Sequence, residues 1–421
     1  MQLSDDDRDL LSGSHGDGVA LAMRLVTRLA NAMDAPRLRS ISGAHIDSCL
    51  YHGRSGLDFV EALAVGGAAV SVPTTLNVAS LDLIHPNLYR GSAEAGSAAR
   101  ELMDAYVALG CQPTWTCAPY QRRERPAFGE HVAWAESNAI VFANSVLGAR
   151  THRYGDFIDI AAALTGRVPD AGLHRSSGRR ATMVFDASGI SADLLDSDVA
   201  YPLLGFVVGR ACGKQVPVIV GLPPSTSEDR LKAFGAAAAS AGSVAMFHAV
   251  GVTPEAPTLG AACGGTIPAD RIVVTARDLR LARDALSATI ETPLSTISLG
   301  TPHYSLAEID TLQRALAGRT THPDIAVYVS TGREILREAE AQGWVGELEA
   351  AGVTFVTDTC TYITPIIHDR SGLAMTDSAK WAYYAPGNLG VDVVFASLRE
   401  CVESAVAGVV VHDEELWRDA G

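Results

Sequence analysis

The chain has 421 residues, which is enough for two or three domains. Hydrophobic residues make up 48% of it and charged residues only 19%, as is typical of a well-buried globular protein. Its net charge of −15, with no basic run to offset it, argues against nucleic acid or an anionic membrane as partner.

Targeting and redox signals are weak. The acidic N-terminus has no apolar signal core, and no run of about 18 apolar residues predicts a membrane span. The 7 cysteines are odd in number and widely scattered, so they do not form a disulfide framework. These features predict a cytoplasmic protein without a membrane partner.

The first 200 residues are the less regular part of the chain. An Ala/Leu-rich helix is predicted near residues 18–33 and another around 98–109, with Gly-, Thr- and Asn-rich turns between them. Soft domain boundaries are predicted at residues 205 and 300, which gives domains 1–205, 206–300 and 301–421.

The second half alternates strands and helices, which predicts an α/β fold with largely parallel sheets. A Ser-x-x-Glu capping box at 225–228 is expected to open the helix that runs to Ala241. Further helices are predicted at 333–341 and 398–407, and strands at 216–220, 244–250, 295–299, 324–330, 352–356 and 391–396.

Three polar segments follow predicted strands, and ligands in α/β sheets gather at the carboxyl ends of strands. Cys360 follows one strand, Gly300-Thr301-Pro302-His303 another, and His248 lies near the end of a third. We expect these segments to share one crevice.

Several motifs have both a functional and a structural interpretation. Ser42–Asp47, which contains His45, suits a small anionic substrate or is simply a polar loop. Thr75 and Asn77 suit hydrogen bonding to a carboxylate, although capping of the next element is the expected role. Arg150 is a natural carboxylate partner, although an internal pair with Glu136 explains it equally well. Lys380 suits contact with a substrate carboxylate, although an ordinary snorkelling lysine is the expected interpretation.

Two cysteines share an unusual context. Cys117 and Cys360 are each preceded by Thr and followed by a proline, which indicates a chain reversal with the sulfur facing a cavity. There is no C-x-x-C zinc signature, and spacing alone does not choose between an iron–sulfur cluster, a mononuclear metal and a nucleophile. Nucleotide-binding and nucleophile-elbow motifs are missing.

At these residues the sequence resembles the aconitase X family, nearly from end to end. The resemblance implies an aconitase-like α/β/α fold of several domains around a central cleft. It also implies a hydro-lyase that dehydrates a small hydroxy acid. The segments that carry it are Ser42–Asp47, Thr114–Tyr120, Gly129–Ala139, Asn144–Arg150, Asp358–Cys360 and Ser378–Trp381.

The resemblance also implies a site. Cys117 and Cys360 would ligate an iron–sulfur cluster whose iron acts as a Lewis acid on the departing hydroxyl. His45, Lys380 and His303 are the catalytic candidates. The substrate-binding candidates are Ser42, His45, Asp47, Thr75, Asn77, Ser137, Asn138, Ser145, Arg150 and Lys380.

Thr301 departs from the family pattern, because many members have cysteine there. This leaves open a smaller cluster, such as 2Fe–2S, or another ligand, for which Cys263 is a candidate, although a packed thiol explains Cys263 as well. The change favours cis-3-hydroxy-L-proline as substrate, giving Δ1-pyrroline-2-carboxylate, over mevalonate 5-phosphate.

A second departure is length, because no swivelling domain of about 130 residues is visible. We therefore expect a large subunit that needs a small subunit carrying the serine base. Two other hypotheses remain: a cluster-free scaffold protein, and a thiol hydrolase that uses Cys117 with a histidine.

Overall fold

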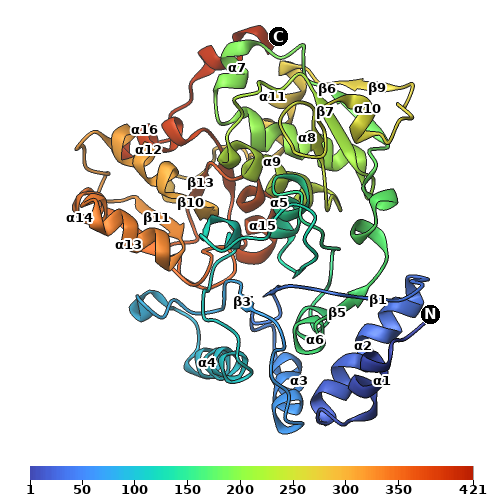
Figure 1. Cartoon of the computed structure of the whole chain (residues 1–421). Coiled ribbons are helices and arrows are strands. Elements are labelled where there is room, and N and C mark those ends of the chain that lie inside the picture. Colours follow the sequence, from blue (N-terminus) through green and yellow to red (C-terminus); the bar gives the residue numbers. More distant parts are fainter. Residues whose placement is uncertain (421) are drawn as a thin grey trace. The chain divides into compact units, whose positions relative to one another are not determined.

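The computed structural model describes residues 1–420 and divides into two compact units (Figure 1). Unit 1 contains residues 1–81 and 91–180, and unit 2 contains residues 82–90 and the chain from 181 onward. The predicted boundaries at 205 and 300 fall inside helix α8 (Ala200–Cys212) and strand β10 (Leu294–Tyr304). Apolar residues run across both points, so composition gives no sign of a boundary there.

Unit 1 is mainly helical on its outside and has one small parallel sheet. The predicted helix near 18–33 is α2, and the helix predicted at 98–109 begins earlier, because Ser92 caps it by accepting a hydrogen bond from the backbone N–H of Ala95 at 3.1 Å. Its helices are α1 (Asp5–Ser12), α2 (Asp17–Ala32), α3 (Arg54–Val65), α4 (Ala93–Ala108), α5 (Ser137–Ser145) and α6 (Ile158–Thr165).

Three short strands form the sheet of unit 1, in the order β3-β2-β4, with both pairs parallel. They are β2 (Ala44–Ile46), β3 (Thr74–Leu76) and β4 (Ala133–Trp134). Strands β1 (Leu38–Ser40) and β5 (Arg167–Pro169) pair separately and antiparallel. Because β2, β3 and β4 run in one direction, the residues that follow them meet at one edge.

Unit 2 contains two sheets that are parallel throughout, as the alternating pattern predicted. The first has the order β12-β11-β10-β13-β14, and the second β8-β7-β6-β9. The strands are β6 (Met183–Asp186), β7 (Pro217–Val220), β8 (His248–Ala249), β9 (Arg271–Val273), β10 (Leu294–Tyr304), β11 (Ala326–Thr331), β12 (Val353–Val356), β13 (Leu373–Thr376) and β14 (Val393–Phe395).

The helices of unit 2 agree closely with the sequence pattern, with one correction. The predicted capping box at 225–228 is wrong, because Ser227 is the cap and its Oγ accepts from Arg230 at 3.2 Å. The helices are α7 (Ala192–Asp196), α8 (Ala200–Cys212), α9 (Glu228–Ala241), α10 (Leu259–Ala262), α11 (Ala276–Ala285), α12 (Leu306–Leu316), α13 (Arg333–Ala341), α14 (Trp344–Ala350), α15 (Ala379–Leu389) and α16 (Leu398–Ala407).

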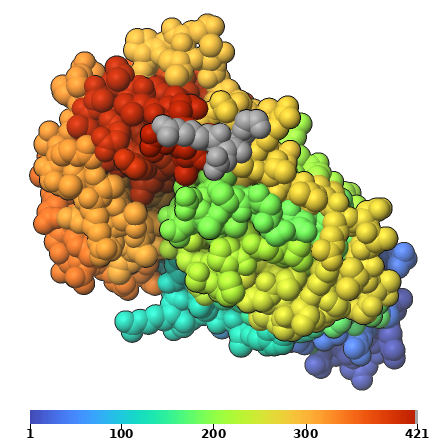
Figure 2. Space-filling view, turned by 90° about the horizontal axis from the view of Figure 1, so that it is seen from above, coloured from blue at the N-terminus to red at the C-terminus, as the bar shows by residue number. Residues whose placement is uncertain are grey.

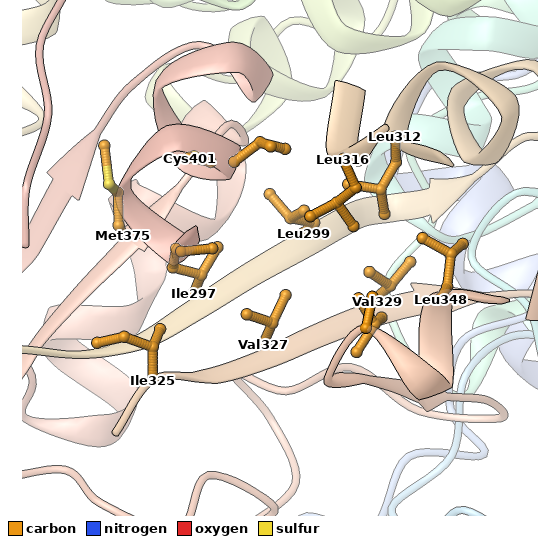
Figure 3. Close-up of a cluster of buried hydrophobic side chains, with 14 of the residues drawn as sticks. Ile297, Leu299, Leu312, Leu316, Ile325, Val327, Val329, Leu348, Met375 and Cys401 are labelled. Atoms are coloured by element: carbon orange, nitrogen blue, oxygen red, sulfur yellow. The ribbon is translucent and has the colours of Figure 1, made fainter. Parts of the chain in front are cut away.

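An apolar core, shown in Figure 3, lies on the five-stranded sheet. Ile297 and Leu299 of β10 are joined there by Val327 and Val329 of β11, and helix α12 covers them with Leu312 and Leu316. Burying each such side chain stabilises the fold by about 1.5–3 kcal/mol. This core holds the strands from which the polar residues of unit 2 extend.

On the face seen in Figure 2, the segment coloured orange to red lies against the segment coloured green to yellow, and both belong to unit 2. Helix α9 of the second segment packs against α15 of the first. None of the helices formed by residues 1–420 combines the length and the apolar character that crossing a membrane requires.

Candidate active site

The first group of site residues lies on the sheet of unit 1. His45 on β2 and Thr75 on β3 are direct partners in the strand register, so their side chains lie side by side. His45 Nδ1 lies 2.8 Å from Thr75 Oγ1, which shows that Thr75 positions the imidazole and that its predicted capping role is wrong. His45 is fully buried, and its Nε2 has no hydrogen-bond partner among the described residues.

Burial also sets the charge of His45. Desolvation by burial lowers the pKa of the imidazole to about 3. The ring is therefore neutral at physiological pH. A neutral imidazole acts on a substrate by donating or accepting one hydrogen bond, not as a cation.

An acidic or amide residue lies within two residues of the end of each of the three strands. Asp47 follows β2, Asn77 follows β3 and Glu136 follows β4 after one residue, and Asn77 Nδ2 donates to the Asp47 carboxylate. Burial, reinforced by repulsion from Glu136, raises the pKa of Asp47 to about 7. We call His45, Asp47, Thr75, Asn77 and Glu136 the strand-end group.

Asn138 connects the strand-end group to Cys117. Its Nδ2 donates to the Cys117 carbonyl oxygen at 3.0 Å and to the Glu136 carboxylate, and its Oδ1 accepts from the Tyr120 hydroxyl at 2.6 Å. Trp115, two residues before Cys117, has φ of 45°, a strained value for a bulky residue. The cysteine therefore sits on a sharp turn held against the start of α5, as its sequence context predicted.

A pocket of about 220 Å³ opens within unit 1 beside Thr75. Ser42, Trp134 and the two arginines Arg122 and Arg125 also line it. In the sequence, the run 121–125 is a possible source of basic groups for a phosphate, but a charged run is usually a solvated loop, so neither arginine was chosen as a site residue. Guanidinium groups in such a pocket bind carboxylates or phosphates.

Three other candidates of unit 1 have local structural contacts. Arg150 donates to the His174 carbonyl oxygen at 3.0 Å and to Ser176 Oγ at 3.1 Å. Ser137 Oγ lies 3.3 Å from a Glu136 carboxylate oxygen, and Ser145 is buried at the end of α5. Glu136 accepts from the backbone N–H of Ala139 at 2.8 Å and so caps this helix.

The second group of site residues lies in unit 2, on the loop Thr357–Pro365 after β12, which we call the cysteine loop. Asp82 holds its start, accepting from the Thr357 backbone N–H at 2.8 Å and from Thr357 Oγ1 at 2.9 Å. Arg333 donates to both oxygens of Asp358, at 2.5 and 2.7 Å. Cys360 is 2% exposed, so burial and these contacts fix its position.

His303 is the neighbour of Cys360 within unit 2. Its Nε2 donates to the Thr359 carbonyl oxygen at 3.1 Å, which places the proton on Nε2 and the lone pair on Nδ1. A ring nitrogen of His303 lies within 4.8 Å of Cys360 Sγ. Burial lowers the pKa of His303 to about 4, so the ring is neutral, as a metal ligand must be.

Strand β10 is longer than predicted. Gly300, Thr301, Pro302 and His303 were expected to follow the strand, yet they belong to it, because it continues to Tyr304. The Thr301 hydroxyl has no hydrogen-bond partner among the described residues. A neutral hydroxyl is a poor ligand for iron, whereas the neighbouring imidazole is a good one.

Three further predictions change in unit 2. His248 lies on β8 in the other sheet, so the predicted shared crevice with Cys360 is wrong for this residue. Cys263 packs in an apolar cluster with Val184 and Val218, which favours its interpretation as a packed thiol. Lys380 is only 5% exposed, so its interpretation as a snorkelling surface residue is wrong.

Models of the three domains of one family match almost the whole chain. The aconitase X first domain matches residues 1–177, the second domain 181–284 and the third domain 294–407. The chain belongs to the aconitase X family. The resemblance drawn from the short motifs is thereby confirmed.

Named relatives of this aconitase X protein are dehydratases, that is, hydro-lyases. It is 44% identical to a cis-3-hydroxy-L-proline dehydratase of Pseudomonas aeruginosa, over 96% of this chain and 69% of the relative. It is also 44% identical to a cis-3-hydroxy-L-proline dehydratase of Hypocrea jecorina, over 97% of this chain and 69% of the relative. The phosphomevalonate dehydratase large subunit of Methanothermobacter thermautotrophicus is 38% identical, over 92% of this chain and 94% of that one.

A solved structure confirms the predicted α/β fold. The crystal structure of Thermococcus kodakaraensis aconitase X in its holo form superposes with a TM-score of 0.86 at 31% identity. The match covers 96% of this chain and 100% of the other.

Proposed function

We propose that this aconitase X chain dehydrates cis-3-hydroxy-L-proline to Δ1-pyrroline-2-carboxylate. The identity of 44% to two proteins named for that activity carries the proposal, because it extends over 96% and 97% of the chain. The phosphomevalonate dehydratase large subunits are less similar, at 38% and below. In this reaction the C2–H and C3–O bonds break, water leaves, and the resulting enamine rearranges to the cyclic imine.

We further propose that Cys117 and Cys360 are thiolate ligands of an iron–sulfur cluster. In unit 2 the donor chemistry fits, because a ring nitrogen of His303 lies within 4.8 Å of Cys360 Sγ, and imidazole and thiolate both suit iron. His303 therefore takes the place that a third cysteine has in other members, while Cys263 remains in its apolar cluster. When bound, the cluster supplies Lewis-acid assistance to the departing hydroxyl.

The strand-end group supplies the binding contacts for the substrate. The uncommitted Nε2 of neutral His45 hydrogen-bonds a substrate oxygen, and Arg122 of the same unit pairs with the carboxylate. The pKa of about 7 lets Asp47 hold or release a proton near neutral pH. Asn77 and Thr75 keep these two groups oriented.

The base that removes the C2 proton is proposed to be a serine on a small subunit. Relatives named as large subunits, from Methanothermobacter thermautotrophicus and Thermococcus kodakarensis, support such a partner. The reaction is proposed to take place in the cytoplasm, where cysteine ligands stay reduced.

Mevalonate 5-phosphate is the second candidate substrate. Arg122 and Arg125 in the pocket of unit 1 favour it, because two guanidinium groups suit a phosphate. The two substrates differ enough for one assay to decide. The protein with its small subunit should turn over hydroxyproline at least 100-fold more efficiently than mevalonate 5-phosphate, and the reverse preference would overturn the substrate proposal.

The cluster is tested by anaerobic purification followed by visible absorption and by iron and sulfide analysis. Cys360→Ser should remove the charge-transfer absorption and most of the iron. Cys263→Ala is the matched control and should keep both, because that thiol packs with apolar residues. A colourless wild-type protein that binds no iron would support the cluster-free scaffold hypothesis instead.

A further inference from the structure

The first turn of α6 contributes a buried carboxylate next to the strand-end group. Asp159 is 0% exposed, and it forms no ion pair with a basic side chain of the described residues. A carboxylate that is buried without a cation is costly unless hydrogen bonds satisfy its oxygens. The donors around Asp159 therefore account for its presence at this position.

Four donors surround Asp159, and three of them belong to the turn after β2. Its Oδ2 accepts from the backbone N–H groups of Asp47 at 2.8 Å and of Ser48 at 2.9 Å. Its Oδ1 accepts from Ser48 Oγ at 2.9 Å and from the N–H of Ile160, in its own helix, at 2.7 Å. The backbone at Asp47 is thus fixed by a residue 112 positions further along the chain.

The chain that leads into α6 has an unfavourable conformation. Phe157, the residue before this helix, has φ of 72°, a region that bulky residues rarely occupy. Its ring packs against that of Phe59, with the ring centroids 4.6 Å apart. Such a conformation costs about 1–3 kcal/mol and persists where surrounding contacts enforce it, commonly at functional sites. This strain is a sign, independent of the hydrogen bonds, that the placement of Asp159 has a function.

We propose that Asp159 is a positioning residue for the dehydration. It fixes the Asp47–Ser48 turn and so holds the Asp47 carboxyl group at the end of β2, where Asn77 donates to it. Asp159 does not itself contact the substrate, because the four donors occupy both of its oxygens. The inference rests on the proposed function, since it requires that Asp47 takes part in the reaction.

Asp159 also acts on Asp47 through its charge. Burial raises the pKa of Asp159 to about 6, so the carboxylate is mostly ionised at pH 7. Burial and repulsion from Glu136 and Asp156 raise the pKa of Asp47 to about 7, and the charge of Asp159 adds to this effect. The hydrogen bond from Asn77 acts in the opposite direction.

The other titratable groups close to Asp159 are neutral at pH 7. Burial raises the pKa values of Tyr106 on α4, of Cys49 in the turn after β2, and of Cys111. These groups cannot replace a lost negative charge. Removing the charge of Asp159 should therefore lower the pKa of Asp47.

The main test is Asp159→Asn in the full chain with its small subunit. The amide oxygen still accepts from the two backbone N–H groups of the turn, but the negative charge is removed. We expect kcat to fall at least tenfold while KM changes less than threefold. The inflection of the rate near pH 7, which Asp47 causes, should move to lower pH by about half a unit or more.

Asp7→Asn is the matched control for this substitution. Asp7 is another buried carboxylate of unit 1, and it accepts from Arg167 at 2.9 Å, outside the strand-end group. Its variant should be less stable than the wild type, but kcat and the pH profile should not change.

A second pair of variants tests the turn and leaves the charge in place. Ser48 Oγ lies 2.7 Å from the Tyr106 hydroxyl as well as 2.9 Å from Asp159. Ser48→Ala and Tyr106→Phe both lose the first hydrogen bond, but only Ser48→Ala loses the bond to Asp159. We expect kcat to fall about tenfold in Ser48→Ala and to stay within about twofold in Tyr106→Phe. This pair decides the question if Asp159→Asn does not fold.

A measurement without turnover separates this inference from the proposed function. The effect of Asp47→Asn on urea unfolding depends on pH, and this dependence should move to lower pH when Asp159→Asn is also present. If it moves in a protein that does not dehydrate hydroxyproline, only the proposed function is wrong. If Asp159→Asn leaves kcat and the pH profile unchanged, as Asp7→Asn should, or if Ser48→Ala and Tyr106→Phe have equal kcat, Asp159 is only structural and the present proposal is wrong.

Discussion

The strand-end group of unit 1 and the cysteine loop of unit 2 both lie at the carboxyl ends of parallel strands, but they are built differently. In unit 1, His45 keeps one ring nitrogen without a partner and Asp47 has a pKa of about 7. In unit 2, Asp82 and Arg333 tie down the loop around Cys360. The first arrangement leaves groups available to a substrate, and the second fixes a ligand.

The two arrangements have opposite effects on the stability of the fold. Burying His45 with an unsatisfied nitrogen sacrifices stability, as is common at functional sites. The cysteine loop instead gains from charge-assisted hydrogen bonds, which are about twice as strong as neutral ones. Substitutions in the two regions should therefore have different effects: those in unit 1 should reduce catalysis, and those in unit 2 should reduce metal binding.

The largest expected effect is that of His45→Gln. We expect kcat to fall by about 10²–10⁴, because the substrate loses a positioned hydrogen-bonding group, while the iron content stays normal. The dependence of the rate on pH between 5 and 9 should have the same shape in the wild type and the variant, because the pKa of His45, about 3, lies below this range. His15→Gln, on a histidine outside the strand-end group, is the control. Loss of iron in the His45 variant would show that the two regions do not have separate tasks.

Asp82→Asn should mainly increase the rate at which the protein loses iron. The amide would present an N–H₂ group to the Thr357 backbone N–H, in place of an oxygen that accepts from it at 2.8 Å. Two donors then face each other in a buried site, at a cost of about 1–3 kcal/mol. We expect iron to dissociate at least tenfold faster on challenge with a chelator. Unchanged iron release would mean that the cysteine loop is held without Asp82.

Asp47→Asn should change the pH dependence of stability. The native carboxyl holds its proton up to a pKa of about 7, whereas the unfolded one releases it near pH 4, so the native state binds more protons between these values. This contribution to stability is lost as the pH rises through 7. The free energy of unfolding in urea should therefore rise in the variant relative to the wild type, by on the order of 1 kcal/mol, when the pH is changed from 5 to 8. A difference independent of pH would contradict this charge state for Asp47.

The features that could be predicted from the sequence are those that depend on neighbouring residues in the chain. Helices 333–341 and 398–407 coincide with α13 and α16, because their capping and apolar spacing are local. Cys360 was singled out from its Thr and Pro neighbours alone. His45 and Asp47 were singled out as part of a polar cluster in 42–47, and their role in binding the substrate stays a prediction.

Long-range pairing explains what was missed. Thr75 looked like a cap because its partner, His45, is 30 residues away and becomes its neighbour only in the strand register. Asp82 was not a candidate, since it reaches Thr357 across 275 residues of chain. The course of β10 through Gly300 and Pro302 was equally hidden, because both residue types usually end a strand.

Arg150→Ala is expected to have the smallest effect. It tests whether Arg150 binds the substrate, as its motif suggests, or has the structural role that its contacts indicate. The motif around Arg150 made it a substrate-binding candidate, but its guanidinium donates to the His174 carbonyl oxygen and to Ser176 Oγ. We expect kcat/KM to change less than about threefold and the melting temperature to fall by a few degrees, since about two hydrogen bonds are lost. Arg122→Ala is the matched comparison and should raise KM at least tenfold, because that arginine lines the pocket beside Thr75. If the two variants exchanged these effects, the substrate carboxylate would lie at Arg150 and the strand-end group would need another role.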